Sequence, residues 1–398
     1  MAHVDHPDHV DRTARRGGWL AVTVVGTATF TVVTSEMLPV GLLTPLGESL
    51  GVSEGTAGLA LTVTGLAAAV AAPALAPLFA RHDRRRVLVL LMALVGLGNL
   101  LSAWAPNFAV MTAARLLVGV GMGGVWALAA GIAVRLVPPS SVGAATSLVF
   151  SGIAVASVLG VPAGAYLGEL LGWRAAFVAA GVLGLAVAAA LAAALPPLPP
   201  DAGRPRLAEP LADARVRIAL VVVALLVTGH FAAYTYVRPA LEEVSGIRPA
   251  LVGALLLAYG VAGVVGNFAA GFGATRSARG TLVILSALLA ATVFLVPAFG
   301  GSAWAAAALL VLWGVAYGGV SVSVQTWLLA AVPQAREAAS ALLVGVFNTA
   351  IALGAFLGGR AADGLGTASV MYLGGTLASA AALVLATTRP REAARSAE

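Results

Sequence analysis

The stretch TFTVVTSEMLPVGLL, from Thr29 to Leu43, decides how the rest of the chain is interpreted. Almost all of its residues are apolar, yet Glu36 lies in the middle of them. The apolar run begins near Trp19 and continues to about residue 44, which is longer than the roughly 20 residues that a helix needs to cross a bilayer. We therefore predict a membrane-spanning helix that carries a buried acid.

The composition of the whole chain agrees with a membrane environment. Of its 398 residues, 60% are hydrophobic and only 10% are charged, whereas soluble domains carry about 25% charged residues. The chain has no cysteine, which excludes disulfides, thiolate catalysis and cysteine-based metal sites. We find no Walker loop, zinc signature or nucleophile elbow, so the sequence implies no metal or organic cofactor and gives no support for an enzyme.

Apolar runs of spanning length recur along the chain and predict an all-α membrane protein. We count twelve such helices, at residues 19–44, 55–79, 86–105, 108–136, 141–169, 174–196, 216–240, 249–273, 280–298, 303–331, 337–360 and 367–388. The longest polar connection follows the sixth. We therefore predict a domain order of N-terminal tail (1–18), six-helix half (19–196), linker (197–215), six-helix half (216–388) and C-terminal tail (389–398).

Arginine placement predicts the orientation in the membrane. Four arginines lie in loops or helix ends on one side, Arg115 lies within a helix, and the other 18 of the 23 basic residues lie in the tails and the opposite loops. Cytoplasmic loops carry the excess of basic residues. We therefore place both termini in the cytoplasm, and we attribute the net charge of +6 to the membrane rather than to nucleic acid.

The two halves repeat each other in sequence. GGV at 123–125 and VP at 137–138 recur at 318–320 and 332–333, an offset of 195 residues. The same offset matches Arg81 to Arg276 and Arg84 to Arg279. A parallel repeat of two six-helix halves is typical of transporters that bind their substrate between the halves.

Two ionisable residues, Glu36 and Arg115, lie well inside predicted helices, at similar depth. Burial favours a neutral acid and a neighbouring arginine favours a carboxylate, so Glu36 could exchange a proton near neutral pH. The alternative is a static ion pair that fixes helix packing. For Arg115, a structural and a functional role are equally well supported.

Aromatic residues at helical spacing predict a substrate site. Trp126 lies on the Arg115 face of its helix, and His230 with Tyr234 and Trp313 with Tyr317 are each one turn apart. With Asn348, these residues suit a flat, semi-polar ligand. Ordinary aromatic packing is the alternative for each of them. Gly160 and Pro162 mark a place where the fifth helix could bend or slide.

Four motifs resemble those of the major facilitator superfamily, in its twelve-helix drug:proton antiporter branch. They are TSEMLPVGLL (34–43), APLFARHDRRRVL (76–88), RLLVGVGMGG (115–124) and GVPAG (160–164). Ala80 and Thr275 replace the family's acidic residue in the two copies of the second motif. The closer likeness is to bacterial purine ribonucleoside efflux pumps and related sugar and arabinose exporters, in motifs that include GGVWALAAGIAVRLVPP (123–139), GELLGWR (168–174) and TYVRP (235–239).

The resemblance implies an exporter of the cytoplasmic membrane that exchanges a small organic solute for protons by alternating access. It implies that Glu36 couples protons with Arg115, and that a conformational gate includes Arg81, Asp83, Arg84, Arg85, Gly160, Pro162 and Arg276. The residues themselves leave a sugar exporter, a multidrug exporter or a proton-symporting importer open. We expect a monomer in the lipid bilayer whose partners are its small-molecule substrate and protons, with no nucleic acid.

Overall fold

The protein is described by a computed structural model over residues 7–75, 81–199, 209–332 and 334–388. The predicted C-terminal tail and Ala80 lie outside these ranges, as do residues 200–208 of the predicted linker. The described helices are α1 (Pro7–Leu50), α2 (Glu54–Ala74), α4 (Arg84–Ala103), α5 (Phe108–Leu136), α6 (Val142–Val155), α7 (Val161–Leu171), α8 (Trp173–Ala194), α9 (Ala214–Tyr234), α10 (Val237–Pro239), α11 (Pro249–Phe299), α12 (Ala303–Gly318), α13 (Val320–Ala331), α14 (Arg336–Leu365) and α15 (Ala368–Thr387).

The described residues contain eleven helices that are long and apolar enough to cross a membrane. One of them, α11, has 51 residues and at 1.5 Å per residue would be about 76 Å long, more than twice the roughly 30 Å of the hydrocarbon layer. Ser277 interrupts it with non-helical backbone angles (φ −157°, ψ 94°), so α11 makes two crossings. This confirms the predicted all-α membrane fold, with twelve crossings in the described part of the chain.

The chain divides into two compact units, within each of which most residue contacts are made. Unit 1 consists of Met1–Leu38 and Val63–Ala202, and unit 2 of Pro39–Thr62 and Gly203–Glu398. The C-terminal part of α1 and the start of α2, which together form the hairpin Pro39–Thr62, therefore group with the second unit. The predicted halves follow the sequence repeat instead, and their boundaries remain a prediction.

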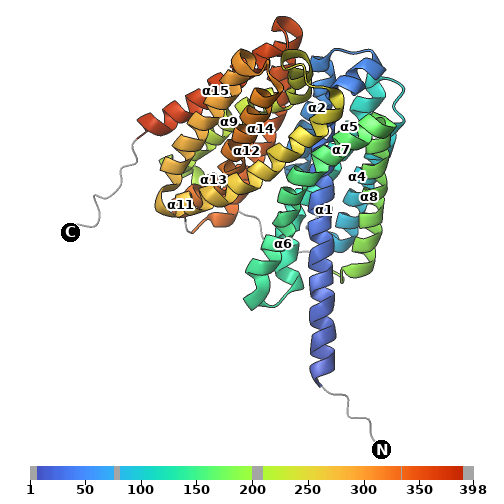
Figure 1. The fold of residues 1–398 in the computed structure, drawn as a ribbon. Coiled ribbons are helices and arrows are strands. Elements are labelled where there is room, and N and C mark those ends of the chain that lie inside the picture. Colours follow the sequence, from blue (N-terminus) through green and yellow to red (C-terminus); the bar gives the residue numbers. More distant parts are fainter. Residues whose placement is uncertain (1–6, 76–80, 200–208, 333, 389–398) are drawn as a thin grey trace, which may run out of the picture. The chain divides into compact units, whose positions relative to one another are not determined.

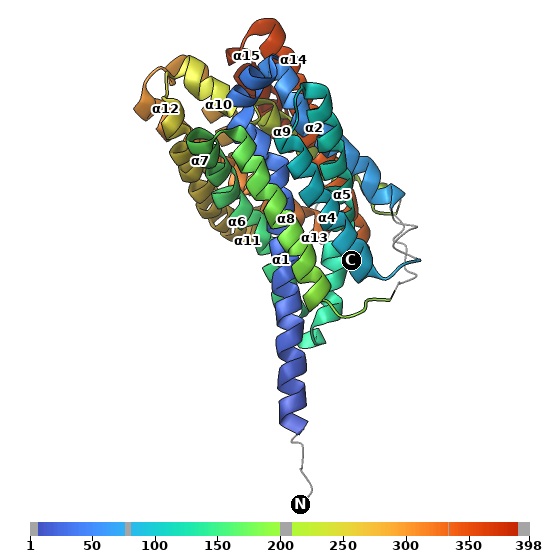
Figure 2. The same ribbon diagram turned by 90° about the vertical axis from the view of Figure 1, so that its right-hand side faces the viewer.

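Unit 1 is built around α4, which lies against α5 and α8 (Figure 2). Small residues allow the helices to approach closely. A Cβ on Gly96 of α4 would lie 2.8 Å from the backbone nitrogen of Leu185, and one on Gly184 of α8 would lie 2.8 Å from the Cα of Gly96. Close backbone approach through small residues is how helices associate where lipid removes the hydrophobic driving force.

Unit 2 is built around α9 and α11. The α9 helix packs on α14 and α15, and α11 packs on α12, α13 and α15 (Figure 1). Glycines again form the contacts: a Cβ on Gly229 of α9 would lie 2.7 Å from the carbonyl oxygen of Gly374 on α15. This packing brings side chains of α9, α11 and α12 together inside unit 2.

Candidate functional site

Glu36 and Arg115 meet inside unit 1. Glu36, on α1, is 3% exposed, and Arg115, on α5, is fully buried. The guanidinium Nη2 of Arg115 donates to the backbone carbonyl of Glu36 over 3.3 Å, and the two side chains interact electrostatically. The hydroxyl of Thr64 on α2 donates to the backbone carbonyl of Arg115. The structure thus brings the two predicted residues together.

The carboxylate of Glu36 is buried without a full set of hydrogen bonds among the described residues. Its Oε1 atom is buried and has no hydrogen-bond partner among the described residues. In the described ranges, Glu36 is also the one acidic residue that is buried. A buried carboxylate without full hydrogen bonding gains most from taking up a proton or a ligand donor. This position can therefore take up a proton or accept a hydrogen bond from a ligand.

His230 lies at the centre of an aromatic cluster inside unit 2. Its ring is parallel to that of Tyr317 on α12, with centroids 3.3 Å apart and an interplanar angle of 5°, and it also stacks with Tyr234 at 5.0 Å. Trp313 lies edge-on to it at 5.7 Å. We name His230, Tyr234, Tyr259, Trp313 and Tyr317 the aromatic cluster. The structure therefore brings the predicted residues His230, Tyr234 and Tyr317 together.

The hydrogen bonds of His230 define its tautomer. Trp313 Nε1–H donates to His230 Nδ1 over 3.0 Å, so Nδ1 carries no proton. In the neutral ring the proton is then on Nε2, which faces the hydroxyl of Tyr259 on α11 at 3.5 Å. A histidine at this depth requires such partners, because an unpaired polar group in an apolar core is costly.

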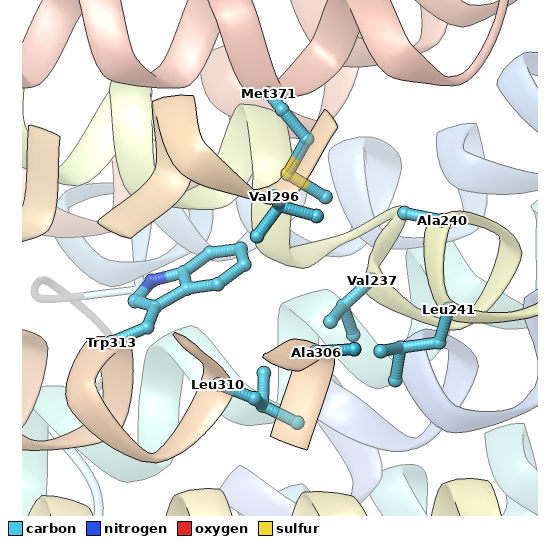
Figure 3. A pocket seen from close by; sticks show the side chains of 8 residues that line it. All are labelled: Val237, Ala240, Leu241, Val296, Ala306, Leu310, Trp313 and Met371. Atoms are coloured by element: carbon cyan, nitrogen blue, oxygen red, sulfur yellow. The ribbon is translucent and has the colours of Figure 1, made fainter. Parts of the chain in front are cut away.

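A small apolar cavity lies beside Trp313 in unit 2. It is lined by Val237, Ala240, Leu241, Val296, Ala306, Leu310, Trp313 and Met371. The benzo ring of Trp313 points into this cavity and its indole nitrogen lies on the side away from Val296 and Met371 (Figure 3). Trp313 therefore presents an apolar edge to the cavity and its polar edge to His230.

The two other predicted substrate contacts lie outside the aromatic cluster. Trp126 belongs to unit 1 and stacks with Phe150 at 6.5 Å. Asn348, on α14, donates through its side-chain amide to the carbonyl of Val344 in its own helix. Conversely, Tyr259 belongs to the aromatic cluster but was not among the predicted site residues. A tyrosine in the middle of an apolar helix was the signal, because its hydroxyl needs a polar partner.

The predicted gate residues at the start of α4 hold helix ends inside unit 1. Asp83 is the N-cap of α4 and accepts from the backbone N–H of Arg85 at 2.8 Å and of Leu198 at 3.3 Å. The backbone N–H of Arg84 donates to the carbonyl of Leu198. The guanidinium of Arg85 donates to the carbonyl of Ala192, in the last turn of α8. Arg81 is exposed.

Unit 2 repeats this arrangement. The guanidinium of Arg279, after the break in α11, donates to the carbonyl of Leu385 in the last turn of α15. The last carbonyls of a helix lack intrahelical partners and carry partial negative charge, so an arginine there satisfies both needs. Arg276 is exposed. The described contacts of these arginines therefore lie within each unit.

Asp83 has a pKa below its usual range. Partial burial acts to raise it, but the backbone N–H groups of Leu198, Arg85 and Arg86, together with the charge of Arg86, outweigh that effect. Hydrogen bonds from N–H groups at a helix start favour the charged carboxylate. Asp83 is therefore a charged cap for α4.

Gly160 and Pro162 lie at a break in regular helix geometry. Residues Ala156–Gly160 form a π-helical turn between α6 and α7. Pro162 is buried at the start of α7, and without an N–H it cannot make the hydrogen bond of a regular helix. A π-helical turn of this kind is a place where a helix can bend.

The hairpin Pro39–Thr62 is held in unit 2 by polar contacts near its turn. Asp363 on α14 accepts from the backbone N–H of Gly55 at 3.0 Å and from the hydroxyl of Ser53 at 2.9 Å. Arg238 donates to the carbonyl of Gly41 at 2.8 Å and pairs with Glu242 at 2.9 Å. Asp363 thus caps the start of α2 from another helix, where the helix dipole favours negative charge.

Comparison with known proteins identifies the family to which this architecture belongs. The sequence profile of the Major Facilitator Superfamily matches residues 25–343 and 220–398. The purine ribonucleoside efflux pump NepI of Escherichia coli (strain K12) is 32% identical over 372 residues, which cover 93% of this chain and 94% of NepI. The pump of the same name from Shigella flexneri has the same identity and coverage.

The fold is similar to that of a bacterial homologue of the human lysosomal transporter Spinster. Its inward-facing, unoccupied structure has a TM-score of 0.70 and 18% sequence identity, and the match covers 94% of this chain and 95% of that one. An occupied inward-facing structure also has a TM-score of 0.70. Because the profile and the relatives cover nearly the whole chain, the protein belongs to the Major Facilitator Superfamily and is a multi-pass membrane transporter rather than an enzyme.

Proposed function

We propose that this transporter exports purine ribonucleoside-like solutes in exchange for protons, by alternating access in the cytoplasmic membrane. It works as a monomer with both termini in the cytoplasm. The observation that carries the proton coupling is Glu36, buried at 3% exposure with Arg115 against it and one oxygen without a hydrogen-bond partner among the described residues. Ionisable residues at bilayer depth normally belong to proton or substrate pathways.

The substrate class rests on a relative and on the chemistry of the aromatic cluster. The curated relatives at 32% identity are purine ribonucleoside efflux pumps, and the match covers 93% of this chain. In unit 2, four aromatic rings from α9, α11 and α12 surround the ring of His230. Aromatic side chains stack on nucleobases, and they do so without charge. A neutral solute with a flat ring is therefore the substrate that this cluster suits.

Three alternatives share the same architecture. A sugar exporter would recognise hydroxyl groups, and a multidrug exporter would accept apolar cations. A proton-symporting importer would use the same acid with the opposite coupling. All three are separated from the proposal by transport measurements on the purified protein.

The test is substrate-driven proton movement in proteoliposomes. The protein is reconstituted with a pH-sensitive dye inside the vesicles, and guanosine, ribose or a cationic aromatic drug is added as an outward or an inward gradient. We expect guanosine flux to move protons in the opposite direction. The matched control is the Glu36→Gln protein in the same lipids.

Each result assigns the protein to one class. Proton movement with ribose or the drug, and not with guanosine, would replace the substrate class. Protons moving in the same direction as guanosine would make the protein a symporter. Guanosine flux without proton movement would remove proton coupling from the mechanism.

A further inference from the structure

His230 is enclosed by other residues of unit 2. Its side chain is 1% exposed. Its Nδ1 accepts from Trp313, and its Nε2 faces the hydroxyl of Tyr259. Both polar atoms of the ring are therefore directed at protein groups, and a solute that reached the cluster would find neither available for hydrogen bonding.

Tyr317 differs from the rest of the aromatic cluster in its exposure. The other four members are buried, whereas Tyr317 as a residue is partly exposed, although its hydroxyl oxygen is buried. Its ring is nearly parallel to the His230 ring, with centroids 3.3 Å apart. A second ring, Phe231, lies edge-on to it at 6.1 Å. His230 therefore fixes the plane of the ring of this partly exposed residue.

Tyr317 lies on the side of α12 that is opposite to its most exposed apolar side chains. On α12, Trp304 is 87% exposed and Val311 is 37% exposed, so these apolar side chains mark the lipid-facing side of the helix. At about 100° per residue, Tyr317 lies about 40° from Trp313 and about 20° from Leu310, but about 120–140° from Trp304 and Val311. Trp313 and Leu310 are both buried. Tyr317 therefore lies on the inner side of α12.

We propose that the flat base of the solute stacks on Tyr317, and that His230 is a positioning residue that holds the Tyr317 ring without touching the solute. Trp313 and Tyr259 complete this arrangement by fixing the orientation of the His230 ring. The inference deepens the proposed function and rests on it. It assigns the base, rather than the ribose, to this part of unit 2.

The energy of stacking predicts how large the change in binding affinity should be. Stacking a base on an aromatic side chain contributes roughly 1–3 kcal/mol, which corresponds to a change in Kd of about 5- to 150-fold. Removal of the ring should therefore weaken binding of a nucleoside strongly. Removal of the hydroxyl should matter little, because the phenyl face remains.

The first experiment measures equilibrium binding of tritiated guanosine to the purified full-length transporter. We expect Tyr317→Leu to raise the Kd about fivefold or more, and Tyr317→Phe to change it by less than about threefold. The matched control is Tyr372→Leu, because Tyr372 on α15 is half-exposed and lies outside the aromatic cluster. The concentration of ribose that displaces half of the bound guanosine should be the same in all variants.

The second experiment is a double-mutant cycle between His230 and Tyr317. His230→Phe keeps a ring but removes the acceptor for Trp313, and we expect it to weaken guanosine binding. Because His230 acts through Tyr317, the same substitution should have no further effect in the Tyr317→Leu protein. If His230→Phe does not yield folded protein, Trp313→Phe removes the same hydrogen bond and should show the same loss of additivity.

The outcomes separate this inference from the proposed function. Guanosine binding that survives Tyr317→Leu would overturn the stacking assignment and leave the proposed function standing. Equal losses from His230→Phe in both backgrounds would overturn the positioning role, since His230 would then act independently of Tyr317. Failure of the unaltered protein to bind guanosine would overturn both the substrate class and the inference.

Discussion

Glu36 and His230 are both buried polar residues, yet their surroundings give them different chemistry. Both ring nitrogens of His230 face protein groups, whereas Oε1 of Glu36 has no hydrogen-bond partner among the described residues. A buried polar group whose hydrogen bonds are satisfied mainly stabilises and orders the fold. A buried carboxylate with an unsatisfied oxygen retains a reason to bind a proton.

The first prediction concerns Glu36. Glu36→Gln keeps the size of the side chain but cannot carry a proton, so proton flux driven by guanosine should fall to the level of protein-free liposomes. Guanosine binding should remain. Glu48→Gln on the same helix, where Glu48 is exposed, is the control and should transport normally. Uphill export by the Glu36→Gln protein at the normal rate would show that another group couples the proton.

The second prediction concerns the pH dependence that Asp83 adds to stability. Because its pKa is lowered in the folded protein, its stabilising effect is present above the unfolded value of about 3.9 and is lost as the pH falls below that value. We expect Asp83→Ala to reduce stability at pH 7 by about 1 kcal/mol, the usual size of a lost N-cap.

Thermal unfolding in detergent at pH 7 and at pH 3 measures this effect. The difference between Asp83→Ala and the unaltered protein should shrink at pH 3, because Asp83 of the unfolded chain is then mostly protonated and the stabilising effect of the lowered folded-state pKa declines. Glu209→Gln is the control, since Glu209 precedes a short helix without a side-chain capping hydrogen bond. A difference that is the same at both pH values would mean that charge plays no part in this cap.

At the scale of helices, glycine decides which elements approach each other closely. Within α14, Gly359 faces α2: a Cβ on it would lie 2.8 Å from the carbonyl oxygen of Gly55 and 2.5 Å from the hydroxyl of Tyr236. Five residues on, a Cβ on Gly364 would meet nothing within 4 Å. The same residue type thus has a packing role at one position and none at the other.

The third prediction follows from this contrast. Gly359→Ala should destabilise the protein by about 1–3 kcal/mol, because the added methyl overpacks a backbone contact. Gly364→Ala should stabilise it by about 0.5–1 kcal/mol, because alanine loses less conformational entropy in a helix. Thermal unfolding of the two variants should show shifts in Tm of opposite sign, downward for Gly359→Ala and upward for Gly364→Ala. Equal shifts would mean that the close contact of α14 with α2 does not limit stability.

At the scale of the whole molecule, the distribution of arginine predicts the orientation in the membrane. Most arginines lie in the tails and in alternate loops, which favours cytoplasmic termini. The membrane-spanning helices themselves contain few charged residues, so they do not counteract this preference.

The fourth prediction tests orientation in a chain without native cysteine. Gly17→Cys, at an exposed position near the start of the first span, should react with a membrane-impermeant maleimide in inverted vesicles and not in intact cells. Glu48→Cys, at the exposed far end of the same span, should react in intact cells. The reversed pattern would place the termini outside.

The sequence by itself determined the number of crossings and the repeat of the two halves. Both are local properties: a run of about 20 apolar residues is visible in any window of the chain, and a repeat needs no knowledge of contacts. The break at Ser277 divides α11 between the predicted helices 249–273 and 280–298. The depth of Glu36 and Arg115 was also local, since it follows from counting residues along two helices.

Only the tertiary structure decided which polar groups meet. His230 and Trp313 are 83 residues apart, and Gly55 and Asp363 are 308 apart. Hydropathy does not specify which face of one helix touches which face of another, because lipid and protein interior are almost equally apolar. The enclosure of His230, the cap that Asp363 provides for α2, and the grouping of Pro39–Thr62 with unit 2 depend on that choice.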